Sequence, residues 1–341
     1  MCASIGGMKA FAVDRYGGPD LLTLRDLPEP EPGPGDLLVE VRAASVNPVD
    51  FKIRGGGVKV LVKDRFPLVL GCDCSGEVVR VGAGVTKFAP GDQVFARLSK
   101  DRIGTFAERV LVGEAFAAKK PSRLSHAEAA SIPLVGLTSW QALVDIGKLQ
   151  PGGRVLVHAG SGGVGTFAIQ LARHLGAVVA TTASAKNHDL MVRLGATQVV
   201  DYKTERFEDV VEPCDVVFDT QGGETLERSF KVVKPGGVVV TVGGSPDAKF
   251  AKAWGLNPLL VLLLRFMMRK VTRLARQKEA EFEYLFMRPD GEQLGRIASL
   301  LDQGTIKPVL DRTFPFAETK AAVAYVEAGR AVGKVVIVRD D

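Results

Sequence analysis

The stretch HAGSGGVGTFAIQ, residues 158–170, decides the fold class of this chain. It follows the apolar run RVLVHAG, which predicts a strand, and it leads into VGTFAIQLARHLG, which predicts a helix. Glycines between a strand and a helix let backbone N–H groups approach a pyrophosphate, and the positive helix end favours that charge. A tight turn without a ligand is the alternative. The expected binding residues are Gly160, Ser161, Gly162, Gly163, Val164 and Gly165.

Strand and helix patterns alternate around this loop from about residue 128 onward. Short Val-rich strands separated by helices predict a parallel, doubly wound sheet. Residues 1–127 are instead β-rich, with short strand patterns between glycines and prolines, and residues 290–341 return to that first domain. The expected organisation is a split β-rich domain (1–127 plus 290–341) with an inserted dinucleotide domain (128–289).

Bulk composition restricts the class of protein. The 341 residues fit two domains, and 46% hydrophobic with 24% charged residues is ordinary for a globular chain. A formal charge of +5 without a recognisable nucleic-acid motif gives no reason to expect a nucleic-acid partner. Four cysteines are too few for a disulfide framework, and the N-terminus lacks a signal-peptide pattern, so we expect a cytoplasmic protein.

The second strand of the inserted domain indicates which nucleotide is bound. An acidic residue at its end would take the ribose hydroxyls of NAD, but VVATTASAKN ends without one. Ser184 and Lys186 offer a hydroxyl and a cation for a 2′-phosphate, and Tyr202 ends the following strand. Asp189 lies too far into the next helix to take the acidic role. NADP(H) is therefore favoured over NAD, although Lys186 as a solvated loop lysine is an alternative.

Motifs along the whole chain resemble the medium-chain dehydrogenase/reductase superfamily. They are AASVNPVDFKIRGG, FPLVLGCDCSGEVVRVGAGV, FAPGDQVFA, GTFAERVLV, AASIPLVGLTSWQAL, HAGSGGVGTFAIQLARHLGA and GRAVGKVVI. The resemblance implies an α/β fold in which a Rossmann doubly wound domain is inserted in a GroES-like β-rich catalytic domain.

The pair of cysteines in GCDCSGEVV, residues 71–79, raises the question of a zinc site. Zinc members of the family place cysteine, histidine and cysteine ligands where this sequence has Asn47, Cys72 and the region of Val135. Only Cys72 remains as a soft ligand, whereas a catalytic zinc takes about three protein ligands. The four-cysteine structural zinc lobe is missing as well. We therefore expect no metal.

The zinc-free branch that the sequence resembles contains alkenal/enone reductases and quinone oxidoreductases. This implies NADPH-dependent hydride transfer to a small hydrophobic α,β-unsaturated carbonyl; a quinone as acceptor, or an NADPH-binding redox sensor without turnover, are the alternatives. Asn47 and Lys52 are the expected catalytic residues, because an N–H donor or a cation would stabilise charge on the carbonyl oxygen. Both are also expected beside the nicotinamide or its ribose. Lys52 as a surface lysine is the alternative.

Further cofactor contacts are implied by the resemblance alone, and core packing is the alternative for Phe286 and Met287. The stretch FEYLFMR around them has strand character, and a homodimer is expected through that edge. These contacts are Thr138, Thr220, Gln221, Gly222, Val242, Gly243, Gly244, Phe286, Met287, Gly333 and Lys334.

An apolar run, PLLVLLLRFMM at residues 258–268, is too short to span a bilayer and is followed by the basic RKVTRLARQK. An amphipathic helix on a membrane surface is the less favoured interpretation. Packing on protein is favoured, and Trp254, Leu262 and Phe266 suggest a lid for an apolar substrate.

Overall fold

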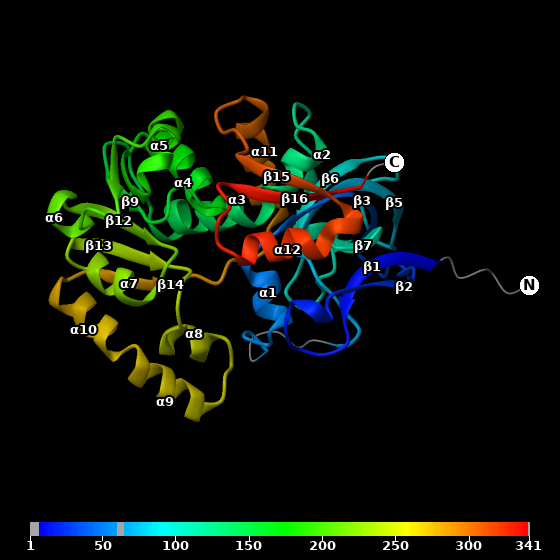
Figure 1. Cartoon of the computed structure of the whole chain (residues 1–341), viewed down its shortest axis with the longest axis horizontal. Coiled ribbons are helices and arrows are strands. Elements are labelled where there is room, and N and C mark those ends of the chain that lie inside the picture. Colours follow the sequence, from blue (N-terminus) through cyan, green and yellow to red (C-terminus); the bar gives the residue numbers. More distant parts are fainter. Residues whose placement is uncertain (1–6, 60–64, 340–341) are drawn as a thin grey trace, which may run out of the picture. The chain divides into compact units, whose positions relative to one another are not determined.

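The chain divides into two compact units in the computed structural model, which describes residues 7–59 and 65–339 (Figure 1). Unit 1 comprises Met1–Leu137 and Arg288–Asp341, and unit 2 comprises Thr138–Met287. Unit 1 is β-rich and unit 2 holds a parallel sheet with helices, so the predicted fold class is confirmed. The domain boundaries expected at 127/128 and 289/290 stay a prediction.

Unit 2 is built on a six-stranded sheet in which every neighbouring pair is parallel. The order is β11-β10-β9-β12-β13-β14, which in chain order reads 3-2-1-4-5-6, the doubly wound dinucleotide-binding order. The chain runs outward in opposite directions from β9 and β12, so the switch point lies between them. The strands are β9 (Arg154–Val157), β10 (Val178–Ala183), β11 (Gln198–Asp201), β12 (Cys214–Asp219), β13 (Val233–Thr241) and β14 (Glu281–Tyr284).

The helices of unit 2 begin and end at recognisable signals. The helix α5 ends at Gly195, whose φ of 116° is the left-handed conformation that glycine adopts without strain. The helix α9 begins after Asn257, whose side chain accepts a hydrogen bond from the Leu259 N–H. The helices are α4 (Gly163–His174), α5 (His188–Leu194), α6 (Phe207–Val210), α7 (Gly223–Ser229), α8 (Ala248–Ala253), α9 (Pro258–Met267) and α10 (Arg269–Gln277).

Unit 1 contains a seven-stranded sheet and a three-stranded sheet. The large sheet has the order β15-β16-β3-β5-β6-β8 with β7 also paired to β3, and the small sheet has the order β2-β1-β4. The C-terminal strand β16 pairs in parallel with β15 and antiparallel with β3, so both ends of the chain build this sheet. The strands are β1 (Gly7–Val13), β2 (Thr23–Pro28), β3 (Asp36–Val46), β4 (Leu68–Val69), β5 (Asp73–Val81), β6 (Gln93–Arg97), β7 (Arg109–Gly113), β8 (Ala117–Lys119), β15 (Leu310–Pro315) and β16 (Lys334–Val338).

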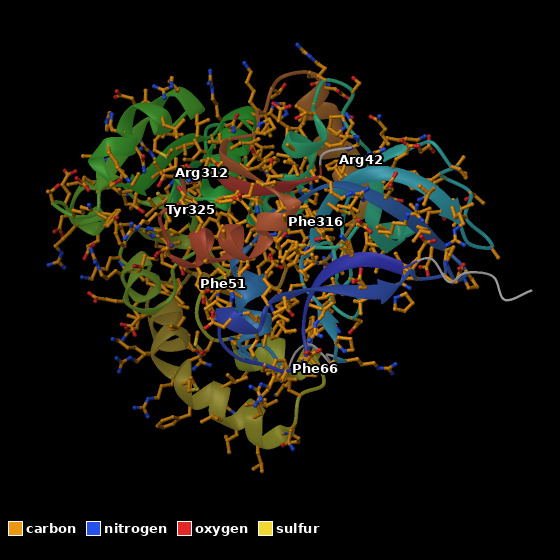
Figure 2. All side chains as sticks on the ribbon, turned by 45° about the vertical axis from the view of Figure 1, so that its right-hand side comes forward. Arg42, Phe51, Phe66, Arg312, Phe316 and Tyr325 are labelled. Carbon is orange, nitrogen blue, oxygen red and sulfur yellow. The ribbon has the colours of Figure 1, made fainter. Side chains whose placement is uncertain are left out.

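Helices of unit 1 cover these sheets and tie distant segments together. The buried Arg54 at the end of α1 donates to both oxygens of Glu327 on α12 at 2.8 and 2.9 Å. The guanidinium of Arg312 on β15 lies 5.0 Å from the ring centroid of Tyr325 on α12 (Figure 2). The helices are α1 (Pro48–Arg54), α2 (His126–Ala130), α11 (Gly291–Asp302) and α12 (Thr319–Glu327), and α3 (Pro133–Trp140) spans the unit boundary.

Candidate functional site

The glycine loop of unit 2 joins β9 to α4 at the switch point of the sheet. The Gly160 N–H donates to Thr182 O over 2.9 Å, and the Ala159 N–H donates to Thr182 Oγ1 over 3.0 Å, which fixes the loop to the end of β10. A Cβ on Gly165 would lie 2.4 Å from Ala159 O. A side chain there would therefore push the helix away from the loop, and glycine is required by close approach.

A bound dinucleotide fits the amino end of α4. Gly162 precedes this helix, and no side chain of the described residues forms a capping hydrogen bond there. The N–H groups of the first turn therefore have no side-chain acceptor, and they carry the positive end of the helix dipole. A pyrophosphate supplies acceptors of this kind. The predicted residues Gly160, Ser161, Gly162, Gly163, Val164 and Gly165 all lie in this loop and first turn.

Two glycine loops lie side by side at the carboxyl ends of β12 and β13. A Cβ on Gly222 would lie 2.7 Å from Gly244 N, and a Cβ on Gly243 would lie 2.6 Å from Gly222 N. The loops therefore touch through backbone, which places the predicted Thr220, Gln221 and Gly222 against Val242, Gly243 and Gly244. Of these, Thr220 Oγ1 donates to His158 O over 3.3 Å, which links the β12 end to the β9 end.

The buried carboxylate of Asp219 holds these two loops, and it is not among the residues predicted from the sequence. It accepts from the Gln221 N–H at 3.0 Å, from the Gly222 N–H at 2.9 Å and from Thr241 Oγ1 at 2.7 Å. Thr241 Oγ1 in turn accepts from the Gly243 N–H at 3.0 Å. The sequence does offer a signal for Asp219, because an acidic residue at the last position of a strand, just before a glycine turn, can accept hydrogen bonds from the backbone of that turn.

His158 is a second residue beside the glycine loop that is not among those predicted from the sequence. Its ring is buried between β10 and α7, with Nδ1 3.3 Å from Thr182 Oγ1 and Nε2 3.1 Å from Ser229 Oγ. Burial lowers the pKa of His158 to about 4, so the ring is neutral at pH 7. It lies directly before the glycine loop and positions that loop through two hydroxyl partners.

The residues expected at a ribose phosphate lie at the ends of β10 and β11. Ser184 follows β10 and is largely buried, while Lys186 lies in the short 3-10 helix η4 (Ala185–Asn187) and is exposed. Ala183 and Asp201 are paired in the register of β10 with β11, and the exposed Tyr202 follows directly. The structure therefore brings these three predicted residues to one edge of the sheet.

Thr138 and Phe286 lie in packed surroundings within unit 2. Thr138 is buried on α3, next to Ser139, whose hydroxyl donates to Val164 O over 3.4 Å. Phe286 follows β14, and its ring lies 5.0 Å from that of Trp254 and 5.9 Å from that of Phe250. The ring of Phe286 is half-buried in this aromatic cluster, and its contact with the cofactor stays a prediction. Met287 is the next residue and is half-buried.

A buried polar network in unit 1 surrounds Asn47. Its side-chain nitrogen donates to Asp73 Oδ2 over 2.9 Å, and its side-chain oxygen accepts from Lys334 Nζ over 2.6 Å. Ser45 Oγ also donates to Asp73 Oδ2 over 3.0 Å, and Lys334 Nζ also donates to Val46 O over 2.9 Å. Asn47, Asp73 and Lys334 are all buried, so the amide of Asn47 is engaged inside the unit at both ends.

Burial shifts the titration of the groups in this network. It raises the pKa of Asp50, whose carboxylate accepts from the Asn47 N–H over 2.7 Å, to about 6. Burial also raises the pKa of the Cys72 thiol and of Asp73, and it lowers the pKa of Lys334. For Asp73 and Lys334, the charge of the other residue opposes the effect of burial. The Asp73 carboxylate is therefore compensated by a cation and by neutral donors.

The network occupies the place where the resemblance puts the ligands of a catalytic zinc. Asn47 and Cys72 stand at two of the three ligand positions, and Lys334 brings an ammonium group beside them. Within residues 7–59 and 65–339, no group of three or more His, Cys, Asp or Glu side chains could hold a metal ion. The Lys334 ammonium supplies a positive charge near Asp73, as a metal ion at this place would.

The other two predicted residues of unit 1 differ in their surroundings. Lys52 lies on α1 with an exposed side chain, so the structure does not bring it into the network of Asn47. Gly333 has a φ of 79°, and a Cβ there would lie 2.2 Å from Val309 O, which gives a packing reason for glycine. Lys334, predicted as a cofactor contact, turns its ammonium toward Asn47.

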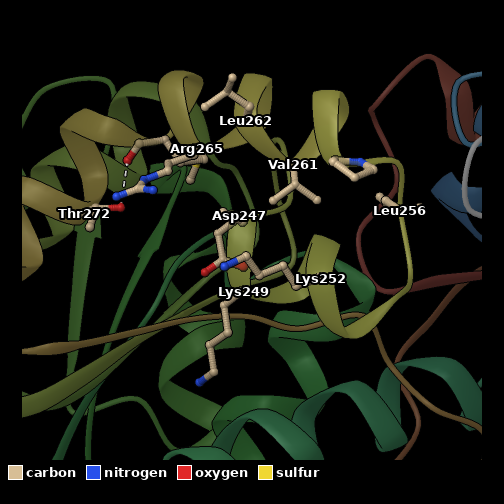
Figure 3. Close-up of a pocket in the computed structure, with 11 residues that line it drawn as sticks. Asp247, Lys249, Lys252, Leu256, Val261, Leu262, Arg265 and Thr272 are labelled. Atoms are coloured by element: carbon tan, nitrogen blue, oxygen red, sulfur yellow. Dashed lines mark hydrogen bonds between the residues drawn. The ribbon is translucent and has the colours of Figure 1, made fainter.

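A groove of about 840 Å³ lies between α8, α9 and α10 in unit 2 (Figure 3). It contains none of the residues expected to contact the cofactor. Both Lys252 and Arg265 line it together with apolar side chains such as Leu256, Val261 and Met268. Among the described residues, no helix is long and apolar enough to cross a membrane.

Comparison with known proteins agrees with the class that this geometry defines, a nicotinamide-dependent oxidoreductase. Family models described as alcohol dehydrogenase GroES-like domain and as zinc-binding dehydrogenase match residues 33–122 and 194–337. The NAD(P)H oxidoreductase RTN4IP1, mitochondrial, of Danio rerio is 36% identical over 97% of this chain and 91% of its own length. The NADPH-dependent alkenal/one oxidoreductase, chloroplastic, of Arabidopsis thaliana is 33% identical over 97% and 79%.

Solved structures give the same assignment. The quinone oxidoreductase from Coxiella burnetii superposes with a TM-score of 0.85 at 34% identity, covering 98% of this chain and 99% of that chain. The chain belongs to the medium-chain dehydrogenase/reductase superfamily, as the sequence motifs predicted.

Proposed function

We propose that this chain transfers a hydride from NADPH to a small hydrophobic α,β-unsaturated carbonyl without a metal ion. The observation that carries the proposal is the Lys334–Asn47–Asp73 network, in which two opposite charges, joined through the Asn47 amide, occupy the place of the metal ligands. A reaction that polarises its substrate through zinc needs metal ligands at those positions. Conjugate reduction needs mainly a correctly held nicotinamide and a donor for the developing oxyanion.

The residues of the chain have separate tasks in this proposal. The loop Gly160–Gly165 and the touching loops after β12 and β13 hold the dinucleotide, which supplies the hydride when bound. Lys52 offers an exposed cation for the nicotinamide ribose or the substrate oxygen. Asn47 shares a capping box with Asp50 and so fixes the start of α1, the helix that carries Lys52. Solvent is the proposed proton donor for the enolate.

NADP(H) is the proposed cofactor. In support, β10 is followed by Ser184 and the exposed Lys186, so this strand does not end in the carboxylate that would reject a 2′-phosphate. The remaining proposed contacts are Thr138, Tyr202, Phe286, Met287 and Gly333.

Homodimer formation through the edge strand β14 and a cytoplasmic location also belong to the proposal. β14 pairs only with β13 among the described residues, which leaves one of its edges for a partner. The relatives named above include mitochondrial and chloroplastic proteins, so the compartment needs its own test. Cell fractionation and sedimentation velocity address these two points.

The alternative acceptor is a quinone, which the name of the Coxiella burnetii protein favours. The decisive experiment follows NADPH oxidation with enones and with quinones in parallel, each repeated with NADH and with a chelator. A saturated ketone as product, preference for NADPH and indifference to the chelator support the proposal. Turnover of quinones alone replaces the substrate class. NADPH binding without turnover of either acceptor would make the chain a redox sensor.

A further inference from the structure

The positive charge of this protein is concentrated in one segment of unit 2. Residues 248–278, the α8–α10 segment, contain eight Lys or Arg residues and no Asp or Glu. Because the whole chain has a formal charge of +5, all other residues together carry −3. Lys249 and Lys270 form ion pairs with Glu283 and Glu227. For Arg265, Arg273 and Arg276 the structure records no ion pair with a described residue.

The same segment exposes a stripe of large apolar side chains. The side chains recur along α9 at spacings of three and four residues, which places them on one face of the helix. Each is at least 52% exposed, whereas Leu264 and Met268 on the other face are buried. The stripe consists of Leu259, Leu262, Leu263, Phe266 and Met267.

Basic side chains continue the apolar stripe on the next helix. The Thr272 N–H donates to Met268 O over 2.9 Å, and the Met268 N–H donates to Leu264 O over 2.9 Å, so helical bonding runs through the junction of α9 and α10. Arg269 and Lys270 therefore follow Phe266 on its own face, and the Arg269 guanidinium lies 4.1 Å from the centroid of that ring. The result is an apolar face bordered by cations.

We propose that the α8–α10 segment docks this protein on the surface of an anionic phospholipid bilayer. Leucines and a phenylalanine on one helix face enter the boundary between headgroups and acyl chains, while arginines beside them meet lipid phosphates. Monomeric proteins rarely leave a contiguous apolar face in water, so this one requires an occupant. The segment is absent from the machinery proposed for hydride transfer, so the docking stands independently of the reaction.

Charge decides against the other occupants of this face. A second copy would bring eight cations against eight cations without an acidic residue in either segment. Nucleic acid would satisfy the arginines and leave the five apolar side chains in water. An anionic bilayer satisfies both sets at once. The sequence alone favoured packing on protein, and the exposure of the stripe is what changes that preference.

Co-sedimentation of the full chain with vesicles tests the proposal. Wild type should pellet with vesicles of phosphatidylcholine and phosphatidylglycerol in equal parts and remain in the supernatant with phosphatidylcholine alone. The double variant Arg273→Glu/Arg276→Glu should reduce binding to the anionic vesicles by about tenfold or more, since each basic residue near the surface contributes. Leu263→Ser/Met267→Ser should reduce it similarly. Added salt should weaken the binding of wild type.

A matched control carries the same charge change on unit 1. Lys87→Glu/Arg296→Glu replaces two exposed cations outside the segment and should pellet like wild type. Thermal unfolding and NADPH binding verify that each variant is folded. The proposal is overturned if wild type does not pellet, or if the control loses as much binding as Arg273→Glu/Arg276→Glu. It is also overturned if Leu263→Ser/Met267→Ser changes a dimer into a monomer in sedimentation velocity while vesicle binding is unchanged.

Discussion

The ammonium of Lys334 donates a hydrogen bond of 2.6 Å to the side-chain oxygen of Asn47, although 287 positions separate the two residues in the chain. The other end of the Asn47 amide reaches Asp73 over 2.9 Å. The C-terminal strand therefore completes a charge-compensated network begun by β3 and β5. Both ends of the Asn47 amide are therefore engaged within unit 1, and its predicted catalytic role stays a prediction.

Removing the cation of this network should destabilise the fold. Lys334→Met removes one of the two cations near the buried Asp73, and Arg97 remains 3.9 Å from that carboxylate. We expect the free energy of unfolding to fall by about 3 kcal/mol, the low end for a buried charge that loses a partner. Denaturant unfolding measures the change. Lys320→Met is the matched control, because Lys320 is about half exposed and 3.3 Å from Asp20, and it should cost less than about 0.5 kcal/mol. Equal losses in the two variants would contradict the network.

The pKa of Asp50 should appear in the pH dependence of stability. Its ordinary value is 3.8 and burial raises the folded value to about 6, so the folded chain binds this proton more tightly than the unfolded chain does. The free energy of unfolding of wild type should therefore fall, relative to Asp50→Asn, as pH rises from about 4 to about 6, by about 3 kcal/mol in total. Above that window the difference should be constant. A difference that rises with pH would refute the assignment.

Filling the glycine loop should weaken cofactor binding. Gly165→Ala places a methyl group 2.4 Å from Ala159 O, so the first turn of α4 must shift away from the loop. We expect the Kd for NADPH to rise by at least about tenfold, equivalent to about 1.4 kcal/mol. Fluorescence titration with NADPH measures it. Gly295→Ala, whose added Cβ would meet no described atom within 4 Å other than its chain neighbours and the backbone of its own helix, should leave the Kd unchanged and stability within about 1 kcal/mol of wild type.

The choice between the two nucleotides should depend on the end of β10. Lys186→Glu places a carboxylate where a 2′-phosphate is proposed to bind, and we expect about tenfold weaker binding of NADPH with little change for NADH. Parallel titrations with both nucleotides give the ratio. Arg296→Glu makes the same charge change in unit 1 and should leave the ratio unaltered. A proportional loss for both nucleotides would place Lys186 elsewhere in the cofactor site.

Local pattern was sufficient to predict the parallel sheet of unit 2 and its glycine loop. The strand before residue 158 and the helix after it are β9 and α4, because alternation, glycine turns and helical spacing are properties of neighbouring residues. The helix α1 was not predicted, since its seven residues carry too little periodicity. Its stability comes instead from a capping box at Asn47 and from the ion pair of Arg54 with Glu327.

Contacts between residues far apart in the chain limited how much of the candidate site could be predicted from the sequence. Nothing next to Asp219 in the sequence indicates that Thr241 lies 2.7 Å away, and nothing near Asn47 indicates Lys334. Exposure is equally non-local, because the same leucines could be covered or bare depending on which elements pack beside α9. The residue types at the site could therefore be proposed from motifs, whereas their partners and burial required the fold.

The strand β16 lies between β15 and β3 in the sheet of unit 1, and this has a consequence for how the protein is made on the ribosome. Unit 2 is one continuous stretch of chain, and we expect it to fold as soon as it has emerged. Unit 1 must wait for its last strand, and until then Asp73 lacks the Lys334 cation. A nascent chain stalled before β16 would therefore carry a folded nucleotide-binding unit beside an open sheet. That sheet edge is the surface that a chaperone would have to shield.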